Sequence, residues 1–76
     1  MEFYIDKNGK RCNVYNCGKK KQEEMSAKGW RLKLSSGYNQ TPQEIYDEMA
    51  KHYIEVKIYW CGTRIPGLHD YFAFVR

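Results

Sequence analysis

The sequence contains no apolar run close to the roughly 20 residues that a membrane-spanning helix requires. It also lacks the G-x-x-x-x-G-K-[ST] pattern of a phosphate loop, so nothing supports nucleotide hydrolysis. Its three cysteines cannot all pair with one another, and its first residues, MEFYIDKNGKR, carry charges where a signal peptide would be apolar. We therefore expect a soluble protein of the reducing cytoplasm, with no membrane partner.

Basic residues are concentrated in the first half of the chain. Residues 1–33 contain nine Lys or Arg against four Asp or Glu, whereas residues 34–76 contain four against five. The net charge of +4 therefore resides in the N-terminal half. A positive field of this kind favours association with polyanions, although it carries no information about the fold.

The chain is also short of residues with which to build a core. Seventy-six residues predict one small domain, residues 1–76, and a domain of this size buries only about 60% of the surface of its unfolded chain. Seven Tyr, three Phe and two Trp are present, and each can bury on the order of 150–250 Å². We expect these aromatic residues to supply much of the core.

The segment 41–53 predicts an amphipathic helix. Thr41 and Glu44 have the spacing of a capping box, and Pro42 stands at the first helical position, where a missing N–H costs nothing. One face is apolar and the opposite face is mainly acidic. The apolar positions are Ile45, Tyr46, Met49, Ala50 and Tyr53, and the polar ones are Glu44, Asp47, Glu48 and Lys51.

A β-hairpin is predicted at the N-terminus, with strands at 3–5 and 11–15. Asn8-Gly9 between them favours a two-residue type I′ turn, in which both residues adopt positive φ. That register pairs Ile5 with Cys12 and Phe3 with Val14, so these four side chains should face the core. The opposite face would then display Tyr4, Asp6, Arg11, Asn13 and Tyr15.

Hydrophobic periodicity and glycines indicate the remaining elements. A helix is expected at 18–28, ended by Gly29 in the left-handed conformation. Strands are expected at 29–34 and 54–61, then at 71–75 after a turn at 62–68. The residues predicted to point inward are Trp30, Leu32 and Leu34 on the first of these strands and Ile54, Val56, Ile58 and Trp60 on the second.

These elements predict an α+β fold. The expected architecture is a two-layer sandwich, in which two helices cover one face of a mainly antiparallel sheet of about five short strands. The expected order along the chain is β-β-α-β-α-β-β.

Cys61, His69 and Asp70 are the most enzyme-like group, because a hairpin could bring the thiol and the imidazole together. A cysteine beside Trp60 more often packs as a small residue, and His next to Asp is common in turns. We therefore predict no catalytic residues, no enzymatic activity and no cofactor. Alkylation of Cys61 followed against pH tests this prediction.

A zinc site would need Cys12, Cys17 and Cys61 together with His52 or His69. Positions 12 and 17 differ by an odd number, so on a continuing strand they point to opposite faces. Their spacing also lies at the edge of the C-x₂₋₄-C range of zinc knuckles. We predict no metal site.

The favoured function is docking on nucleic acid, or on a nucleoprotein complex, through a basic surface. Gly18 precedes three lysines at a predicted helix start, where backbone N–H groups and cations together can hold an anion. Tyrosines beside basic residues can stack on unpaired bases. The predicted contact residues are Lys7, Lys10, Arg11, Tyr4, Tyr15, Lys19, Lys20, Lys21, Arg31 and Lys33.

The alternative is a protein-directed inhibitor or adaptor. By analogy, small proteins of phages and mobile elements modulate host complexes in this way. The residues predicted for this role are Glu44, Asp47 and Glu48 on the acidic helix face and Arg64 and Ile65 in the Pro66 turn.

Overall fold

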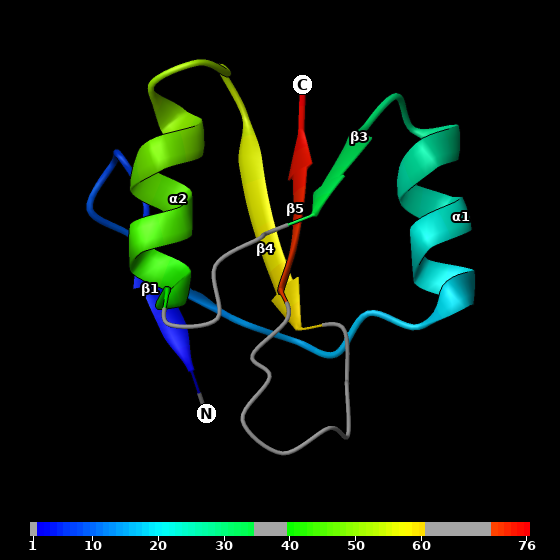
Figure 1. The fold of residues 1–76 in the computed structure, drawn as a ribbon, viewed down its shortest axis with the longest axis horizontal. Helices are drawn as coiled ribbons and strands as arrows, with labels where there is room; N and C mark the ends of the chain where they lie inside the picture. The colour runs from blue at the N-terminus through cyan, green and yellow to red at the C-terminus, as the bar shows by residue number, and fades with distance from the viewer. Residues whose placement is uncertain (1, 35–39, 61–70) are drawn as a thin grey trace.

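The computed structural model describes residues 2–34, 40–60 and 71–76 (Figure 1). The elements confirm the α+β class, the five short strands and the expected order. Within the described residues, neither helix has the length or the apolar character needed to cross a bilayer. The elements are β1 (Phe3–Ile5), β2 (Arg11–Asn13), α1 (Lys19–Ala27), β3 (Arg31–Leu34), α2 (Pro42–Ala50), β4 (Val56–Trp60) and β5 (Tyr71–Val75).

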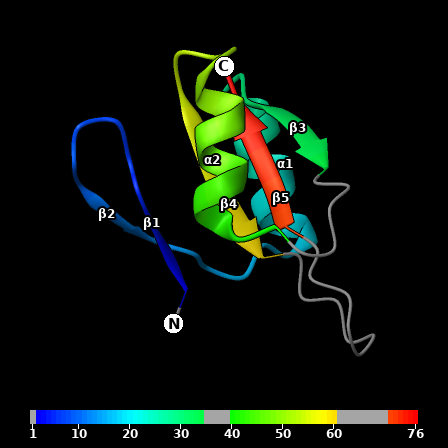
Figure 2. The same cartoon turned by 60° about the vertical axis from the view of Figure 1, so that its left-hand side comes forward.

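The strands form two antiparallel sheets instead of one. β1 pairs with β2, and β5 is the central strand of a second sheet in the order β3-β5-β4. Figure 2 shows the β1–β2 hairpin standing beside this second sheet. An isolated parallel bridge between Asn16 and Trp60 links the end of the hairpin to the end of β4.

The two helices lie on opposite faces of the three-stranded sheet, not on one face as expected (Figure 1). Phe74 packs with Met25 of α1, whereas its neighbour Ala73 packs with Ile45 of α2. The reason is visible in β5, which reads YFAFV and has no polar residue on either face. A strand that is apolar on both faces needs cover on both.

α2 confirms the predicted capping in detail. The Thr41 hydroxyl accepts from the Glu44 N–H at 3.2 Å, and the Glu44 carboxylate accepts from the Thr41 N–H at 3.2 Å. Ile45 and Tyr46 are buried as expected. The helix ends at Ala50, so Tyr53 lies beyond it. The N–H groups of His52 and Tyr53 both donate to the carbonyl of Met49.

The hairpin register differs from the predicted one by one residue. Tyr4 pairs with Cys12 and Ile5 with Arg11, because the loop has three residues instead of two. The Asp6 carboxylate accepts from the N–H groups of Asn8 and Lys10, and Gly9 alone adopts positive φ, at 79°. This shift turns over the side chains of β1, whereas Cys12 and Val14 face the core as predicted. Tyr4 is therefore buried, while Phe3 and Ile5, predicted as core, are 45% and 39% exposed.

α1 and β3 follow the prediction more closely. Gly29 ends the helix with φ of 90°, and the N–H of Trp30 reaches the carbonyl of Met25, as in a Schellman motif. Trp30 is buried as predicted. Leu32 is 40% exposed, in contrast to the prediction, because it borders a hollow of about 330 Å³ beneath α1 at the outer strand of the sheet.

β4 is shorter than the predicted strand 54–61 and begins at Val56. Ile54, predicted to point inward, precedes the strand and is 78% exposed. Trp60 is also exposed, while Tyr59, on the opposite face, packs against the core cluster beneath α1. β4 therefore uses both of its faces, because a helix lies over each face of the sheet.

Candidate nucleic-acid interface

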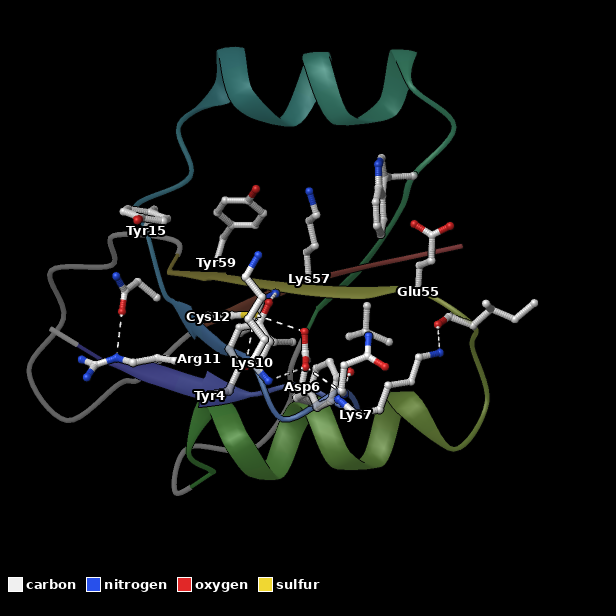
Figure 3. Close-up of a pocket in the computed structure, with 17 residues that line it drawn as sticks. Tyr4, Asp6, Lys7, Lys10, Arg11, Cys12, Tyr15, Glu55, Lys57 and Tyr59 are labelled. Atoms are coloured by element: carbon white, nitrogen blue, oxygen red, sulfur yellow. Dashed lines mark hydrogen bonds between the residues drawn. The ribbon is translucent and has the colours of Figure 1, made fainter.

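A groove of about 520 Å³ runs between the β1–β2 hairpin and the outer edge of β4 (Figure 3). We call it the edge groove. Five of the ten residues predicted to contact nucleic acid line it, namely Tyr4, Lys7, Lys10, Arg11 and Tyr15. The register shift turned over the side chains of β1, and the cations of the hairpin loop and of β2 border the groove.

The hairpin is held to β4 at three points. Near the start of β4 the Lys7 ammonium donates to the carbonyl of Ile54 at 2.6 Å. In the middle the Ile58 N–H donates to the hydroxyl of Tyr4 at 3.4 Å. At the end of β4, Trp60 exchanges backbone hydrogen bonds with residues 15 and 17, at 2.9 and 2.8 Å. These contacts fix the two walls of the groove relative to each other.

α2 supports the hairpin from below. The Gln43 side chain accepts from the N–H of Ile5 at 2.6 Å and donates to its carbonyl at 2.9 Å, so it pairs with the outer edge of β1. The Tyr46 hydroxyl accepts from the N–H of Lys7 at 3.0 Å. The ring of Tyr46 stacks on that of Tyr4, with centroids 4.9 Å apart.

Some of the outward backbone groups of β4 have no hydrogen-bond partner among the described residues. Alternate residues of an edge strand direct their N–H and C=O away from the sheet. Ile58 and Trp60 belong to this set, and their contacts with the hairpin are those given above. Val56 lies in the same register, and no hydrogen bond reaches its outward groups from the residues that the structure describes. The groove therefore contains a donor and an acceptor that a ligand can use.

The cations of the groove outnumber its carboxylates, because Lys7, Lys10, Arg11 and Lys57 line it against Asp6 and Glu55. Asp6 accepts hydrogen bonds from the hairpin loop, first of all from the Lys10 N–H, and these hold the pKa of its carboxyl below the ordinary value. Glu55 pairs with Arg76 at 3.1 Å. Among the described residues, no ion pair involves Lys7, Lys10 or Lys57. The groove is therefore suited to an anion.

Two tyrosines border the groove, one exposed and one half-buried. Tyr15 is 56% exposed, and Tyr59 is half-buried with the Lys21 ammonium 5.8 Å from its ring centre. Figure 3 shows Tyr15, Tyr59 and Lys57 in a row along the side of β4 that faces α1. Burial raises the pKa of Tyr59, so its phenol stays neutral at physiological pH.

Tyr4, predicted to stack on bases, is a core residue. Tyr4 is 4% exposed. The pKa of its hydroxyl is raised, and burial is the largest cause of this rise. It holds the hairpin against β4 and α2, so it shapes the groove without offering a face to a ligand.

The remaining predicted cations do not join the edge groove. Lys19, at the start of α1 with Lys20, borders the smaller hollow beneath α1. Arg31 and Lys33 lie on β3, at the opposite edge of the sheet from β4, and the Arg31 guanidinium lies 5.6 Å from the ring of Tyr53. The predicted single basic surface is thus divided between two edges.

Sequence reasoning missed Lys57 and Tyr59. Both were assigned to the outward face of the strand 54–61, and no function was given to that face. The available signal was the spacing of Lys57 and Tyr59, which are two residues apart and therefore share one face of the strand. The chain order alone does not say that this strand has an open edge beside the hairpin.

The acidic face of α2 is largely occupied by local contacts. Glu44 completes the capping box, and Asp47 accepts from the Gln43 amide at 3.0 Å. Glu48 pairs with Lys51 at 3.4 Å. Arg64 and Ile65, the other residues predicted for a protein partner, lie outside the described residues.

The two described cysteines lie in different clusters of the core. Cys12 packs beside Tyr4, and burial together with Asp6 raises the pKa of its thiol. Cys17 is buried with Met25 and Trp30 on the other face of the sheet. Among the described residues, no three of His, Cys, Asp and Glu come together as a metal site. Cys61, His69 and Asp70 lie outside the described residues.

Comparison with known proteins gives no relative. The chain matches no protein-family model, and searches of curated proteins and of solved structures likewise found no match.

Proposed function

We propose that this protein is a small, non-enzymatic binding protein that docks on nucleic acid, or on a nucleoprotein complex, through the edge groove. The observation that supports this function is the set of groove lysines, Lys7, Lys10 and Lys57, none of which is in an ion pair among the described residues. Phosphate groups carry the matching charge along a polymer, and the groove lining extends from Ile54 to Tyr59.

The physical basis is release of counterions. Each phosphate neutralised by a lysine or arginine releases condensed cations, so binding weakens as salt rises. With roughly four contacts, from the three groove lysines and Arg11, log K should fall against log salt with a slope of about −3 for a single strand. A partner bound through apolar contacts would show a much weaker dependence on salt.

Fluorescence polarisation with labelled mixed-sequence DNA and RNA, single- and double-stranded, tests the proposal. The variant Lys10→Glu/Lys57→Glu should lose at least tenfold in affinity at low salt, because both charges border the groove. Its control is Arg31→Glu/Lys33→Glu, which changes the net charge equally at the opposite edge of the sheet. The control should lose less than threefold.

Two results would contradict this function. One is the absence of binding to any of the four probes at low salt. The other is an equal loss in the two double variants, which would show that net charge alone attracts the probe and that the groove does not hold it.

A further inference from the structure

We propose that the edge groove holds a single strand of nucleic acid and stacks its unpaired bases on Tyr15 and Tyr59. This inference rests on the proposed function and specifies its ligand. A duplex that met the same lysines would contribute only phosphates, whereas a single strand also offers the flat faces and the edges of its bases.

The two tyrosines are positioned by the sheet. The carbonyl of Tyr15 accepts from the Trp60 N–H, so its backbone is tied to the end of β4 while its ring remains 56% exposed. Tyr59 lies within β4 itself, and its ring meets the edge of Phe74 with centroids 5.6 Å apart. Because the backbone of Tyr15 and the ring of Tyr59 are already placed, less order has to be gained when bases stack on them.

Cations flank the row of rings on both sides. Lys57 lies next to Tyr59 on β4, at the end of the row away from Tyr15, and Lys10 belongs to the hairpin wall (Figure 3). Lys21 approaches from α1, with its ammonium 5.8 Å from the ring centre of Tyr59. A backbone that tracks the groove would therefore find the lysines of the hairpin and of β4, and the partly offset charge of Lys21, while its bases lie against the rings.

The outward backbone groups of Val56 add a contact that a single strand can use. They present one N–H donor and one C=O acceptor within the groove wall. Unpaired bases expose their Watson–Crick edges, which carry both donors and acceptors. In a duplex these edges are occupied by the opposite strand.

Neither helix is suited to reading a duplex. A recognition helix places its exposed face in the major groove, close to two lines of phosphates. The exposed face of α2 carries Glu44, Asp47 and Glu48. On α1, Lys21 and Lys28 approach the carboxylate of Glu24, which offsets part of the charge of the lysines.

The test compares a labelled oligothymidylate single strand with a hairpin duplex of equal length, at one low salt concentration. The single strand should bind at least tenfold more tightly. Tyr15→Ala should weaken single-strand binding about tenfold, the loss expected for one stacked base, and leave duplex binding unchanged. Tyr15→Phe keeps the ring and should restore binding, and Tyr53→Ala, which removes a ring beside Arg31 of β3, is the matched control.

The outcomes separate this inference from the proposed function. If duplex and single strand bind equally and Tyr15→Ala has no effect, the single-strand inference is wrong while docking on nucleic acid stands. If polyglutamate displaces the single strand at equal charge concentration, the groove selects for anionic charge alone, and the inference is again wrong. If no probe binds, both proposals fail. Circular dichroism melts of each variant confirm that the fold is intact.

Discussion

The two edges of the three-stranded sheet carry similar charges in different settings. At the β3 edge, Arg31 and Lys33 stand on an outer strand, and neither lines the adjacent hollow beneath α1. At the β4 edge, Lys57 stands on the strand, and the β1–β2 hairpin forms a second wall that brings Lys7 and Lys10. The number of cations is comparable, but only at β4 do they converge on one groove.

This difference shows how the β1–β2 hairpin changes the edge of the sheet at β4. Charged residues on an edge strand keep it from pairing with other strands, and this role accounts for Arg31 and Lys33 on β3. At β4 the hairpin blocks most of the edge instead, and it leaves Val56 facing a groove. The same residue types therefore protect one edge and furnish a binding surface at the other.

Removing the Tyr4 side chain should have the largest effect on this comparison. Tyr4 is buried against Tyr46 and reaches the Ile58 N–H, so Tyr4→Ala should cost about 3–5 kcal/mol, as for other large aromatic truncations. A domain of this length has only about 4–11 kcal/mol in total. Urea denaturation followed by tyrosine and tryptophan fluorescence measures the loss.

Two controls sharpen that result. Leu32→Ala, at the β3 edge, removes a side chain that is already 40% exposed and should cost less than about 1 kcal/mol. Phe3→Ala, on the exposed face of the hairpin, should cost little for the same reason. A Phe3→Ala variant as unstable as Tyr4→Ala would contradict the observed hairpin register.

The sequence predicted α2 well because its signals are local. The capping box needs only Thr41, Glu44 and the helix between them, and both hydrogen bonds form as expected. The Gly29 stop of α1 is equally local, since it depends on one residue that adopts positive φ. Interactions within four residues of one another do not depend on how the rest of the chain packs.

The hairpin register was not predictable from Asn8-Gly9 alone. The turn type depends on a competition in which Asp6 binds two N–H groups of the loop, and this favours three loop residues over two. The burial of Tyr4 against Tyr46 then selects the same register from outside the hairpin. A local signal gave the correct element, and a contact 42 positions along the chain fixed which side faces inward.

The candidate site was half predictable. The hairpin residues Lys7, Lys10 and Tyr15 were identified because charge and aromatic content are properties of composition. Arg31 and Lys33 were grouped with them, since nearness in sequence was the only guide to nearness in space. The order β3-β5-β4 separates them, and that order depends on β5, which comes last in the chain.

Substituting the two glycines with positive φ should have an effect of intermediate size. Gly9, at φ of 79°, shapes the groove wall, and Gly29, at φ of 90°, leads into β3. A Cβ at either position meets no atom within 4 Å, so Gly→Ala should cost about 1–2 kcal/mol at each through the backbone alone. This lowers the melting temperature by about 4–16 °C in a domain of this size.

Binding should distinguish these two glycine variants. Gly9→Ala should weaken binding in the edge groove, while Gly29→Ala should leave it unchanged at a temperature where both are folded. Gly9→Asn should recover part of the loss, because asparagine tolerates positive φ better than alanine does. Equal effects of Gly9→Ala and Gly29→Ala on affinity would indicate that the hairpin loop does not shape the site.

Acid should produce the smallest effect, and it should reach the two regions at different pH. The pKa of Glu24 in α1 is lowered from 4.5 chiefly by its hydrogen bond with Lys28, and that of Asp6 is lowered from 3.8 chiefly by the Lys10 N–H. A lowered folded pKa means that each carboxylate stabilises the fold above its unfolded pKa and loses this contribution as pH falls through the folded one. The contribution of Glu24 should therefore begin to fall near pH 4.5 and that of Asp6 only near pH 3.8.

Urea denaturation of wild type, Glu24→Gln and Asp6→Asn between pH 6 and 3 measures this, because each variant lacks one of the two decreases. If Asp6→Asn keeps the full acid dependence of the wild type, the carboxylate charge of Asp6 does not hold the hairpin loop, and the wall of the edge groove depends on Tyr4 and Lys7 instead.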